Sequence, residues 1–292
     1  MNEVVIISGK GGTGKTTLTA ALAALWTNTV IADCDVDAAD LHLLLDPQID
    51  KQTDFTNGVE AVIDSEKCTQ CGVCRDVCHF DAITSDFIVN PVACEGCAVC
   101  HAFCPVEAIT LNPRQCGEWF ISKTRFGPMV HARLGVAEEN SGKLVSLIRR
   151  EAKQIAETSG FSNLLVDGSP GIGCPVIASI TGASLVVVVT EPTVAGAHDM
   201  ERVLGLACHF KIPAVVIVNK ADLNSDMDKA ITKHAESVGS PVIGRIPYDP
   251  SVTKAMVQGQ TVIEYGQGNA VAAIEEISKV LLSQLDSSLR DP

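Results

Sequence analysis

The sequence predicts an α/β fold, in which a doubly wound and mostly parallel sheet carries a small inserted α+β domain. Two observations support this prediction. Short apolar segments alternate with helical segments along most of the chain, and these segments lack the polar alternation of half-buried strands. A parallel sheet covered by helices on both faces produces this pattern. The alternation stops between about residues 57 and 112, where eight of the twelve cysteines lie.

Length and charge set limits on the class of protein. At 292 residues the chain can bury the core of one large domain and hold a small one besides. The net charge of −13 argues against a nucleic-acid partner, which needs a basic surface. We expect no stable membrane insertion, because the apolar runs are shorter than the roughly 18 residues of a transmembrane helix. The chain runs directly into a predicted strand, so we expect a cytoplasmic protein without a secretory signal.

The elements of the large domain follow from its apolar segments. Strands are predicted at residues 4–7, 29–33, 161–167, 185–190, 214–219 and 241–246. Helices are predicted from Gly14 to about Trp26, at 196–210, at 225–238, after the Ser141-Gly142 pair to about Ala156, and from Ala270 to Leu289. Residues 118–134 are predicted to form a hairpin around Gly127-Pro128, because these two residues favour a turn.

A glycine-rich loop lies between the first predicted strand and the first predicted helix, with the sequence Gly9-Lys10-Gly11-Gly12-Thr13-Gly14-Lys15-Thr16. A loop of this kind presents backbone N–H groups and the positive end of a helix dipole to a phosphate. Lys15 is expected to reach the β- and γ-phosphates, and the Thr16 hydroxyl is expected to bind Mg²⁺. The sequence therefore predicts a nucleotide site.

Two cysteine runs share one spacing, Cys68-x2-Cys71-x2-Cys74-x3-Cys78 and Cys94-x2-Cys97-x2-Cys100-x3-Cys104-Pro105. They resemble the bacterial two-cluster ferredoxin run, in which the fourth cysteine binds the other cluster. The resemblance implies two [4Fe–4S] clusters, one held by Cys68, Cys71, Cys74 and Cys104, the other by Cys78, Cys94, Cys97 and Cys100. Zinc is the alternative metal for these cysteines, but their spacing differs from the usual spacing of zinc ligands. We expect the ferredoxin domain to span residues 57–112, between residues 1–56 and 113–292 of the ATPase domain.

The glycine loop has an additional lysine, Lys10, near its start. With this lysine, the loop resembles the deviant Walker A motif of the MinD/ParA/Mrp ATPases and the nitrogenase iron protein. Three further stretches resemble motifs of that family in the same order. Val30–Asp35 resembles switch I, Asp167–Gly171 resembles switch II, and Ile246–Asp249 resembles the loop that holds the base. The resemblance covers most of the chain outside the cysteine-rich segment.

The resemblance implies an ATPase that forms a homodimer when ATP is bound. Lys10 of each subunit would contact the nucleotide of the other, Asp35 would orient the attacking water, and Lys15 would stabilise phosphate charge. Mg²⁺ would be held by Thr16, Asp35 and Asp167. The implied nucleotide contacts are Gly9, Lys10, Gly11, Gly12, Thr13, Gly14, Lys15, Thr16, Thr17, Gly171, Asn219, Asp222, Pro247 and Asp249.

The identity of the base stays open in the sequence. Asn219-Lys220-Ala221-Asp222 matches the Asn-Lys-x-Asp pattern with which GTPases recognise guanine. In the deviant Walker A family, the residues that contact the base at this point follow no strict sequence pattern. We therefore favour ATP, with GTP as the alternative.

Four cysteines lie outside the two runs. Cys34 and Cys208 are expected in the core, and Cys116 is expected to be a partly buried free thiol. Cys174 follows Asp167 at the same offset as the iron-protein cysteine that binds a cluster shared across the dimer. The second bridging cysteine of that family has no clear counterpart here, so a dimer-bridging or redox role and a structural role both stay open for Cys174.

Together these patterns predict a dimeric iron–sulfur ATPase whose nucleotide state controls electron transfer through two clusters to a partner protein. One alternative is an iron–sulfur cluster carrier, although such carriers usually have a Cys-x-x-Cys late in the chain and none follows Cys104. The other is a MinD- or ParA-like positioning ATPase in a multi-protein complex. That role would call for a membrane helix or a basic DNA-binding face, and the sequence shows neither.

Overall fold

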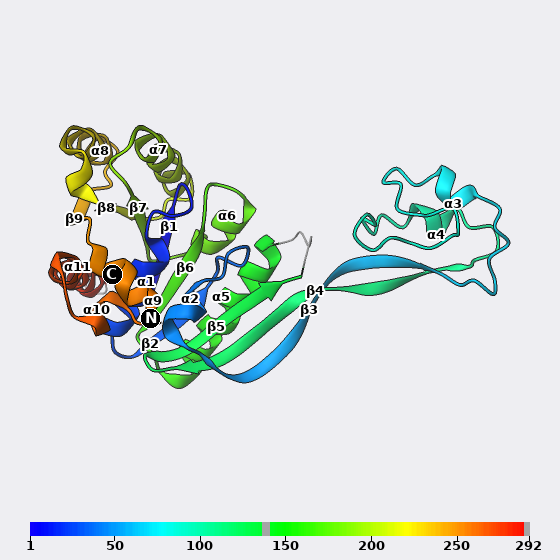
Figure 1. The fold of residues 1–292 in the computed structure, drawn as a ribbon, viewed down its shortest axis with the longest axis horizontal. Helices are drawn as coiled ribbons and strands as arrows, with labels where there is room; N and C mark the ends of the chain where they lie inside the picture. The colour runs from blue at the N-terminus through cyan, green and yellow to red at the C-terminus, as the bar shows by residue number, and fades with distance from the viewer. Residues whose placement is uncertain (136–140, 289–292) are drawn as a thin grey trace. The chain divides into compact units, whose positions relative to one another are not determined.

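The computed structural model describes residues 1–135 and 141–288, which divide into two compact units (Figure 1). The first unit comprises Met1–Gln52, Trp119–Arg133 and the described residues from Ser141 on. The second comprises Thr53–Glu118 with Leu134 and Gly135. The expected insert, residues 57–112, lies within this second unit, whose edges fall a few residues farther out.

The described strands form one nine-stranded sheet in the order β3-β4-β5-β2-β6-β1-β7-β8-β9. Their bounds are β1 (Asn2–Ser8), β2 (Thr29–Asp33), β3 (Gln48–Ile63), β4 (Ile109–Thr124), β5 (Gly127–Leu134), β6 (Asn163–Pro170), β7 (Leu185–Thr190), β8 (Ala214–Asn219) and β9 (Val242–Ile246). From β5 to β9 in this order, neighbouring strands pair in parallel. The predicted α/β class and mostly parallel sheet are confirmed.

Helices connect the parallel strands of the first unit, and three more follow the last strand, β9, in the described residues. They are α1 (Lys15–Leu25), α2 (Leu41–Leu45), α5 (Ser141–Ser159), α6 (Cys174–Ile180), α7 (Val194–His209), α8 (Ser225–Ser237), α9 (Pro250–Val257), α10 (Val262–Tyr265) and α11 (Asn269–Ser288). The second unit has two short helices, α3 (Val73–Asp76) and α4 (Val99–Ala102). Leu289, the predicted end of the last helix, lies outside the described residues.

The central strands are buried on both faces. Val4 and Ile6 of β1 pack with Leu22 of α1 and Ile274 of α11 in one apolar cluster. Because successive strand residues point to opposite faces, Ile7 faces the other side, where a β-carbon at Gly168 would touch both Ile7 and Ser179 of α6. Helices on both faces explain why these strands lack polar alternation.

Two long strands, β3 and β4, differ from the prediction. The apolar pattern of the sequence does not predict β3, and the hairpin predicted from Glu118 starts at Ile109 instead. Most β3 side chains are exposed or half-buried, so the strand has no apolar pattern that could reveal it. Its hydrogen bonds to β4 define it as a strand, and such pairing partners are not visible locally in a sequence.

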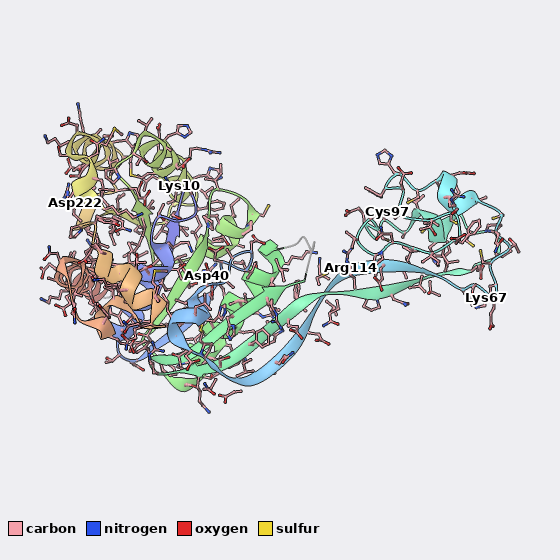
Figure 2. All side chains as sticks on the ribbon, in the orientation of Figure 1. Lys10, Asp40, Lys67, Cys97, Arg114 and Asp222 are labelled. Atoms are coloured by element: carbon pink, nitrogen blue, oxygen red, sulfur yellow. The ribbon has the colours of Figure 1, made fainter. Side chains whose placement is uncertain are left out.

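The parallel strands bring the candidate residues to one edge of the first unit. In open α/β sheets, ligands bind beyond the carboxyl ends of the strands. Lys10 follows β1 and Asp222 follows β8, and Figure 2 labels both on the first unit. Within the described part of the chain, the helices are too short or too polar to cross a membrane.

Candidate functional site

The glycine loop turns sharply into α1, as the sequence predicts. Gly14 precedes the helix with a left-handed φ of 91°, and a β-carbon there would lie 2.3 Å from Asn219 Nδ2. The Asn219 side chain donates a hydrogen bond to the Thr13 carbonyl (2.8 Å). A larger residue at position 14 would be strained and would collide with Asn219. The loop therefore exposes the backbone N–H groups at the start of α1, where an anion is favoured.

Lys15 lies buried between two carboxylates. Its Nζ donates hydrogen bonds to Asp35 Oδ2 (3.0 Å) and Asp167 Oδ1 (3.1 Å). Burial alone would lower the pKa of Lys15, but the charges of Asp167 and Asp35 outweigh it and raise the pKa above its ordinary value. Lys15 is therefore a fixed positive charge at the centre of the site.

The acidic residues of the site come from two adjacent parallel strands. Asp33 at the end of β2 stands in register with Asp167 on β6, and Asp35 follows β2 by two residues. Burial raises the pKa of both Asp33 and Asp35, and the neighbouring carboxylates add to this effect. One oxygen of Asp33 and one of Asp167, both Oδ2, are buried without a hydrogen-bond partner. A buried oxygen without a partner is costly, so these atoms suit a cation or its bound water.

The donors predicted for Mg²⁺ fit that ion in kind. Asp35, Asp167 and Thr16 supply carboxylate and hydroxyl oxygens, which are the ligands that Mg²⁺ prefers. Among the described residues, however, no three His, Cys, Asp or Glu side chains converge on a point that a metal ion could occupy. A magnesium ion here would complete its coordination with nucleotide phosphates and water, as is usual for this ion.

The switch II stretch is tied to the glycine loop. Gly171, the predicted sensor of the γ-phosphate, has a left-handed φ of 94°, and its N–H donates to the Ser8 carbonyl (2.8 Å). The Ser8 hydroxyl in turn donates to the Lys10 carbonyl (2.7 Å). The Gly171 N–H is thus engaged by the last residue of β1, directly before the glycine loop.

The residues predicted for the base have contacts of their own. Asp222 Oδ1 accepts a hydrogen bond from the Tyr248 N–H (2.6 Å), which places it beside Pro247. Asp249 caps α9 through the Ser251 N–H (2.9 Å) and also accepts from the Ala270 N–H (3.0 Å). These bonds from backbone N–H groups lower the pKa of Asp249. The structure therefore gives Asp249 a capping role, whereas Asp222 has one oxygen left for other partners.

Glu191 is a site residue that sequence reasoning missed. It follows β7 directly and forms ion pairs with Lys220 Nζ (2.5 Å) and Lys10 Nζ (3.4 Å). Burial alone would raise the pKa of Glu191, but the two lysines outweigh it and lower the pKa. No motif marks this position. The available signal was an acidic residue directly after a buried strand, at the edge where Asp33 and Asp35 also lie.

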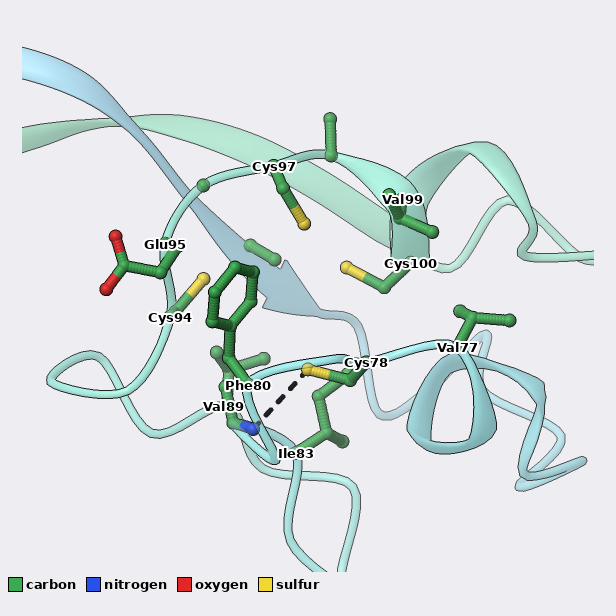
Figure 3. A pocket seen from close by; sticks show the side chains of 14 residues that line it. Val77, Cys78, Phe80, Ile83, Val89, Cys94, Glu95, Cys97, Val99 and Cys100 are labelled. Carbon is green, nitrogen blue, oxygen red and sulfur yellow. Dashed lines mark hydrogen bonds between the residues drawn. The ribbon is translucent and has the colours of Figure 1, made fainter.

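In the second unit, the eight cysteines of the two runs line two hollows. Cys78, Cys94, Cys97 and Cys100 line one hollow, and their sulfur atoms point toward a shared space (Figure 3). Cys68, Cys71, Cys74 and Cys104 line the other. This is the crossed grouping that the ferredoxin-like spacing implies. All of these cysteines are free thiols rather than disulfides.

The two halves of the second unit repeat each other in structure. Each short helix follows a residue with a left-handed φ, Gly72 at 84° and Ala98 at 64°. Cys78 Sγ accepts a hydrogen bond from the N–H four residues later (3.4 Å), and Cys104 Sγ does the same (3.3 Å). Backbone N–H donors favour a thiolate. Cys78 keeps its place in the hollow although His79 follows it where the ferredoxin run has proline.

The remaining four cysteines do not line either hollow. Cys34 is buried, as expected, but Cys208 on α7 is exposed, so its predicted core position was wrong. The apolar stripe of α7 does not include it, since the buried side chains nearby are Leu204 and Ala207. Cys116 is buried and its thiol donates to the Asn57 carbonyl (3.2 Å). Cys174 is exposed at the first residue of α6.

Comparison with known proteins identifies the family. The model of the CobQ/CobB/MinD/ParA nucleotide-binding domain matches residues 4–262. The chain belongs to this family. It is a nucleotide-binding ATPase of the MinD/ParA type, which confirms the predicted enzyme class. An uncharacterised protein of Methanocaldococcus jannaschii is 38% identical over 226 residues, which cover 76% of this chain and 79% of the relative.

Solved structures share the fold. The septum site-determining protein MinD of Pyrococcus horikoshii, in complex with Mg-ADP, has a TM-score of 0.58 at 16% identity, over 96% of this chain and 95% of that one. A chain of the MinC:MinD cell division protein complex of Aquifex aeolicus has a TM-score of 0.58 at 20% identity, over 97% of this chain and 96% of that one. The nine-stranded sheet is thus typical of this ATPase fold.

Proposed function

We propose that this ATPase holds two [4Fe–4S] clusters in its second unit and that its nucleotide state controls electron transfer from them to a partner protein. The observation that carries the proposal is the pair of hollows, each lined by four cysteines. Cys68, Cys71, Cys74 and Cys104 would hold one cluster, and Cys78, Cys94, Cys97 and Cys100 the other. Bound there, the clusters would supply one-electron chemistry.

The donor set fits iron–sulfur clusters better than zinc. Thiolates are the soft ligands that both require. A structural zinc site draws four sulfurs about 2.3 Å from one ion, whereas a cluster separates its ligands around a larger core. In the described residues no three cysteines converge on one ion, although four line each hollow. The proposed domain pair is an ATPase domain of residues 1–56 and 113–292 with a ferredoxin domain of residues 57–112.

The roles proposed for the nucleotide site are supported by its geometry and by the family resemblance. Lys15 would exchange its carboxylates for the β- and γ-phosphates when a nucleotide with Mg²⁺ binds. Asp35 would then orient the attacking water, and Asp167 and Thr16 would support Mg²⁺. In the ATP-bound homodimer, Lys10 would reach the phosphates of the other subunit. ATP is the proposed nucleotide, bound by the glycine loop, Gly171, Asn219 and Asp222.

Along the chain, the second unit follows the switch I stretch closely. After Asp35, only α2 and the start of β3 precede Thr53. On return, β4 leads into β5, which pairs in parallel with β2, the strand that ends at Asp33. A shift of switch I on loss of the γ-phosphate would therefore act on the segments that lead into the second unit.

The experiment is an iron and sulfide determination on anaerobically purified protein, with EPR of the reduced form. The proposal predicts about eight iron atoms per chain, from two cubes of four. Cys97→Ser, at a ligand position, should lower the iron content, while Cys208→Ser, at an exposed cysteine of α7 outside both hollows, serves as the matched control. Stable zinc without iron, or equal iron in the two variants, would contradict the proposal.

A second candidate is a positioning role in a multi-protein complex. The solved structures of similar fold favour it, since they include septum site-determining MinD and a MinC:MinD complex. In that case ATP would control assembly with a partner protein rather than the reactivity of a cluster. The Cys97→Ser variant distinguishes the two candidate functions. A positioning ATPase should keep its ATP-dependent binding to the partner protein when the cluster is lost.

A further inference from the structure

Glu191 is the common partner of two lysines from different loops. Its carboxylate contacts Lys220 Nζ at 2.5 Å and Lys10 Nζ at 3.4 Å. The Glu191 side chain is 12% exposed, against 36% for Lys10 and 34% for Lys220. The carboxylate is thus the most enclosed member of the trio, and the lysines approach it from the glycine loop and from the end of β8.

Two close contacts hold the backbone at Glu191 in place. The Glu191 carbonyl accepts a hydrogen bond from the Thr193 N–H (2.8 Å). Gly196 packs against the same carbonyl so closely that a β-carbon there would lie 2.3 Å away. Glu191 is therefore a carboxylate on a fixed backbone just before α7, and the more exposed lysines are the members of the trio that have room to leave.

Two lysines on one carboxylate allow one of them to leave. Removing the only partner of an enclosed charge is costly, because the charge is left uncompensated. The contact to Lys10 is the longer of the two, and Lys220 would still neutralise Glu191 after Lys10 departs. Lys220 follows Asn219, whose side chain donates a hydrogen bond to the Thr13 carbonyl of the glycine loop. The trio therefore connects the part of the site proposed for the base with the part proposed for the phosphates.

We propose that Glu191 is a positioning residue that holds Lys10 within its own subunit before dimerisation, and that Lys220 compensates Glu191 once Lys10 is released to the nucleotide of the partner subunit. This inference rests on the proposed function, in which Lys10 acts across the dimer. It adds a restraint on that lysine. Dimerisation must then overcome one Lys10–Glu191 ion pair in each subunit.

The test is the dimer dissociation constant of the full chain, measured by sedimentation velocity with a saturating non-hydrolysable ATP analogue. Glu191→Gln frees Lys10 in both subunits and should lower the dimer dissociation constant. The expected change is about 2- to 30-fold, because two partly exposed ion pairs no longer have to be broken. Lys220→Met leaves Lys10 as the only cationic partner in the trio and should weaken the dimer. Glu201→Gln, at an exposed glutamate of α7, controls for the lost charge.

A double-mutant cycle shows whether the effect passes through Lys10. In a Lys10→Ala background, Glu191→Gln should no longer tighten the dimer. An unchanged dimer constant for both Glu191→Gln and Lys220→Met, or an effect of Glu191→Gln that persists without Lys10, would overturn the inference. If Glu191→Gln does not fold, the direction of the Lys220→Met effect decides the matter alone.

The proposed function fails in a different way. A wild-type chain that stays monomeric with the ATP analogue, or a Lys10→Ala variant that hydrolyses ATP at the wild-type rate, would remove the role of Lys10 across the dimer. Normal dimerisation together with an inactive Lys10→Ala variant, but no response to Glu191→Gln, would reject the restraint alone.

Discussion

Lys10 and Lys15 belong to the same loop, but different carboxylates hold them. Lys15 is buried between Asp35 and Asp167, and Lys10 pairs with Glu191 nearer the surface. A nucleotide that binds must draw Lys15 away from its carboxylates, and Mg²⁺ can take over those charges. The ion pairs in this structure are therefore those that nucleotide binding is expected to rearrange.

The two lysines and Asp35 should differ in their effects on turnover. Lys15→Ala removes a charge that contacts the bound phosphates, so nucleotide affinity should fall about 10- to 100-fold, the strength of a charged hydrogen bond. Lys10→Ala and Asp35→Ala should spare binding and lower kcat about 100- to 1000-fold, because the roles proposed for both residues concern the transition state. Nucleotide titration and phosphate release measure the two quantities.

The control for these variants is Lys153→Ala, at an exposed lysine of α5. It should change neither affinity nor kcat. Undiminished turnover in Lys10→Ala or Asp35→Ala would contradict the roles assigned to them.

His131 should make stability depend on pH. Burial lowers its pKa from 6.5 to about 4, and its ring contacts the Ser122 hydroxyl (2.9 Å). The unfolded chain therefore binds more protons than the folded one between about pH 4 and 6.5, and this contribution to stability is lost as pH falls through that window. The loss amounts to up to about 3 kcal/mol. Denaturant unfolding at pH 7 and pH 5 should show a smaller drop for His131→Asn than for the wild type.

His198, which is 68% exposed, provides the control. His198→Asn should keep the wild-type pH dependence. An equal drop in stability for His131→Asn and the wild type would show that His131 is not the group responsible.

At the scale of single residues, motifs predicted some positions and not others. The glycine spacing predicted the turn before α1, where Gly14 has a left-handed φ. The cysteine spacing predicted which four cysteines lie together, since each hollow is lined by cysteines from both runs. Glu191 carries no motif, since its role depends on the distance to Lys10 across the sheet edge. Asp249 matched a motif, but both of its oxygens bind backbone N–H groups.

At the scale of elements, burial decided what was predictable. Three predicted strands, β2, β7 and β8, have the bounds found in the structure, because each is a continuous apolar run enclosed on both faces. The exposed strand β3 was missed for the opposite reason. Helices α7 and α8 differ from their predicted bounds by two residues or fewer at either end.

A contact between β3 and the second cysteine run yields a prediction at this scale. Gly96, between Cys94 and Cys97, has a left-handed φ of 63°, and a β-carbon there would lie 2.2 Å from the Val59 carbonyl on β3. In Gly96→Ala, the new β-carbon would collide with the Val59 carbonyl, and alanine is strained at this φ, so the loop should shift. The variant should then lose one of the two clusters, which is about half of the iron.

Gly58→Ala is the matched control. Gly58 also has a left-handed φ, 73°, but a β-carbon there would meet no atom within 4 Å beyond its own chain neighbours, so that variant carries only the strain of the backbone. It should keep the wild-type iron content. Iron loss of equal size in both variants would show that the close approach to Val59 does not shape the hollow.

At the scale of the whole molecule, the sequence predicted two domains but not how the chain joins them. The two compact units divide near residues 52 and 118, within β3 and β4, rather than in loops. Long paired strands at the junction have no counterpart in the apolar pattern. Composition had marked only the cysteine-rich segment itself, so the predicted edges fell at residues 57 and 112.

The central claim is that nucleotide state and cluster state are coupled. A redox titration of the clusters, with an ATP analogue and then with ADP, tests it most directly. Coupling between linked sites is typically about 1–3 kcal/mol. For a one-electron centre, about 59 mV corresponds to a tenfold change, so the potential of at least one cluster should shift by several tens of millivolts. By linkage, cluster reduction should change nucleotide affinity by the same factor. Identical potentials and identical nucleotide affinities in the two states would contradict the account.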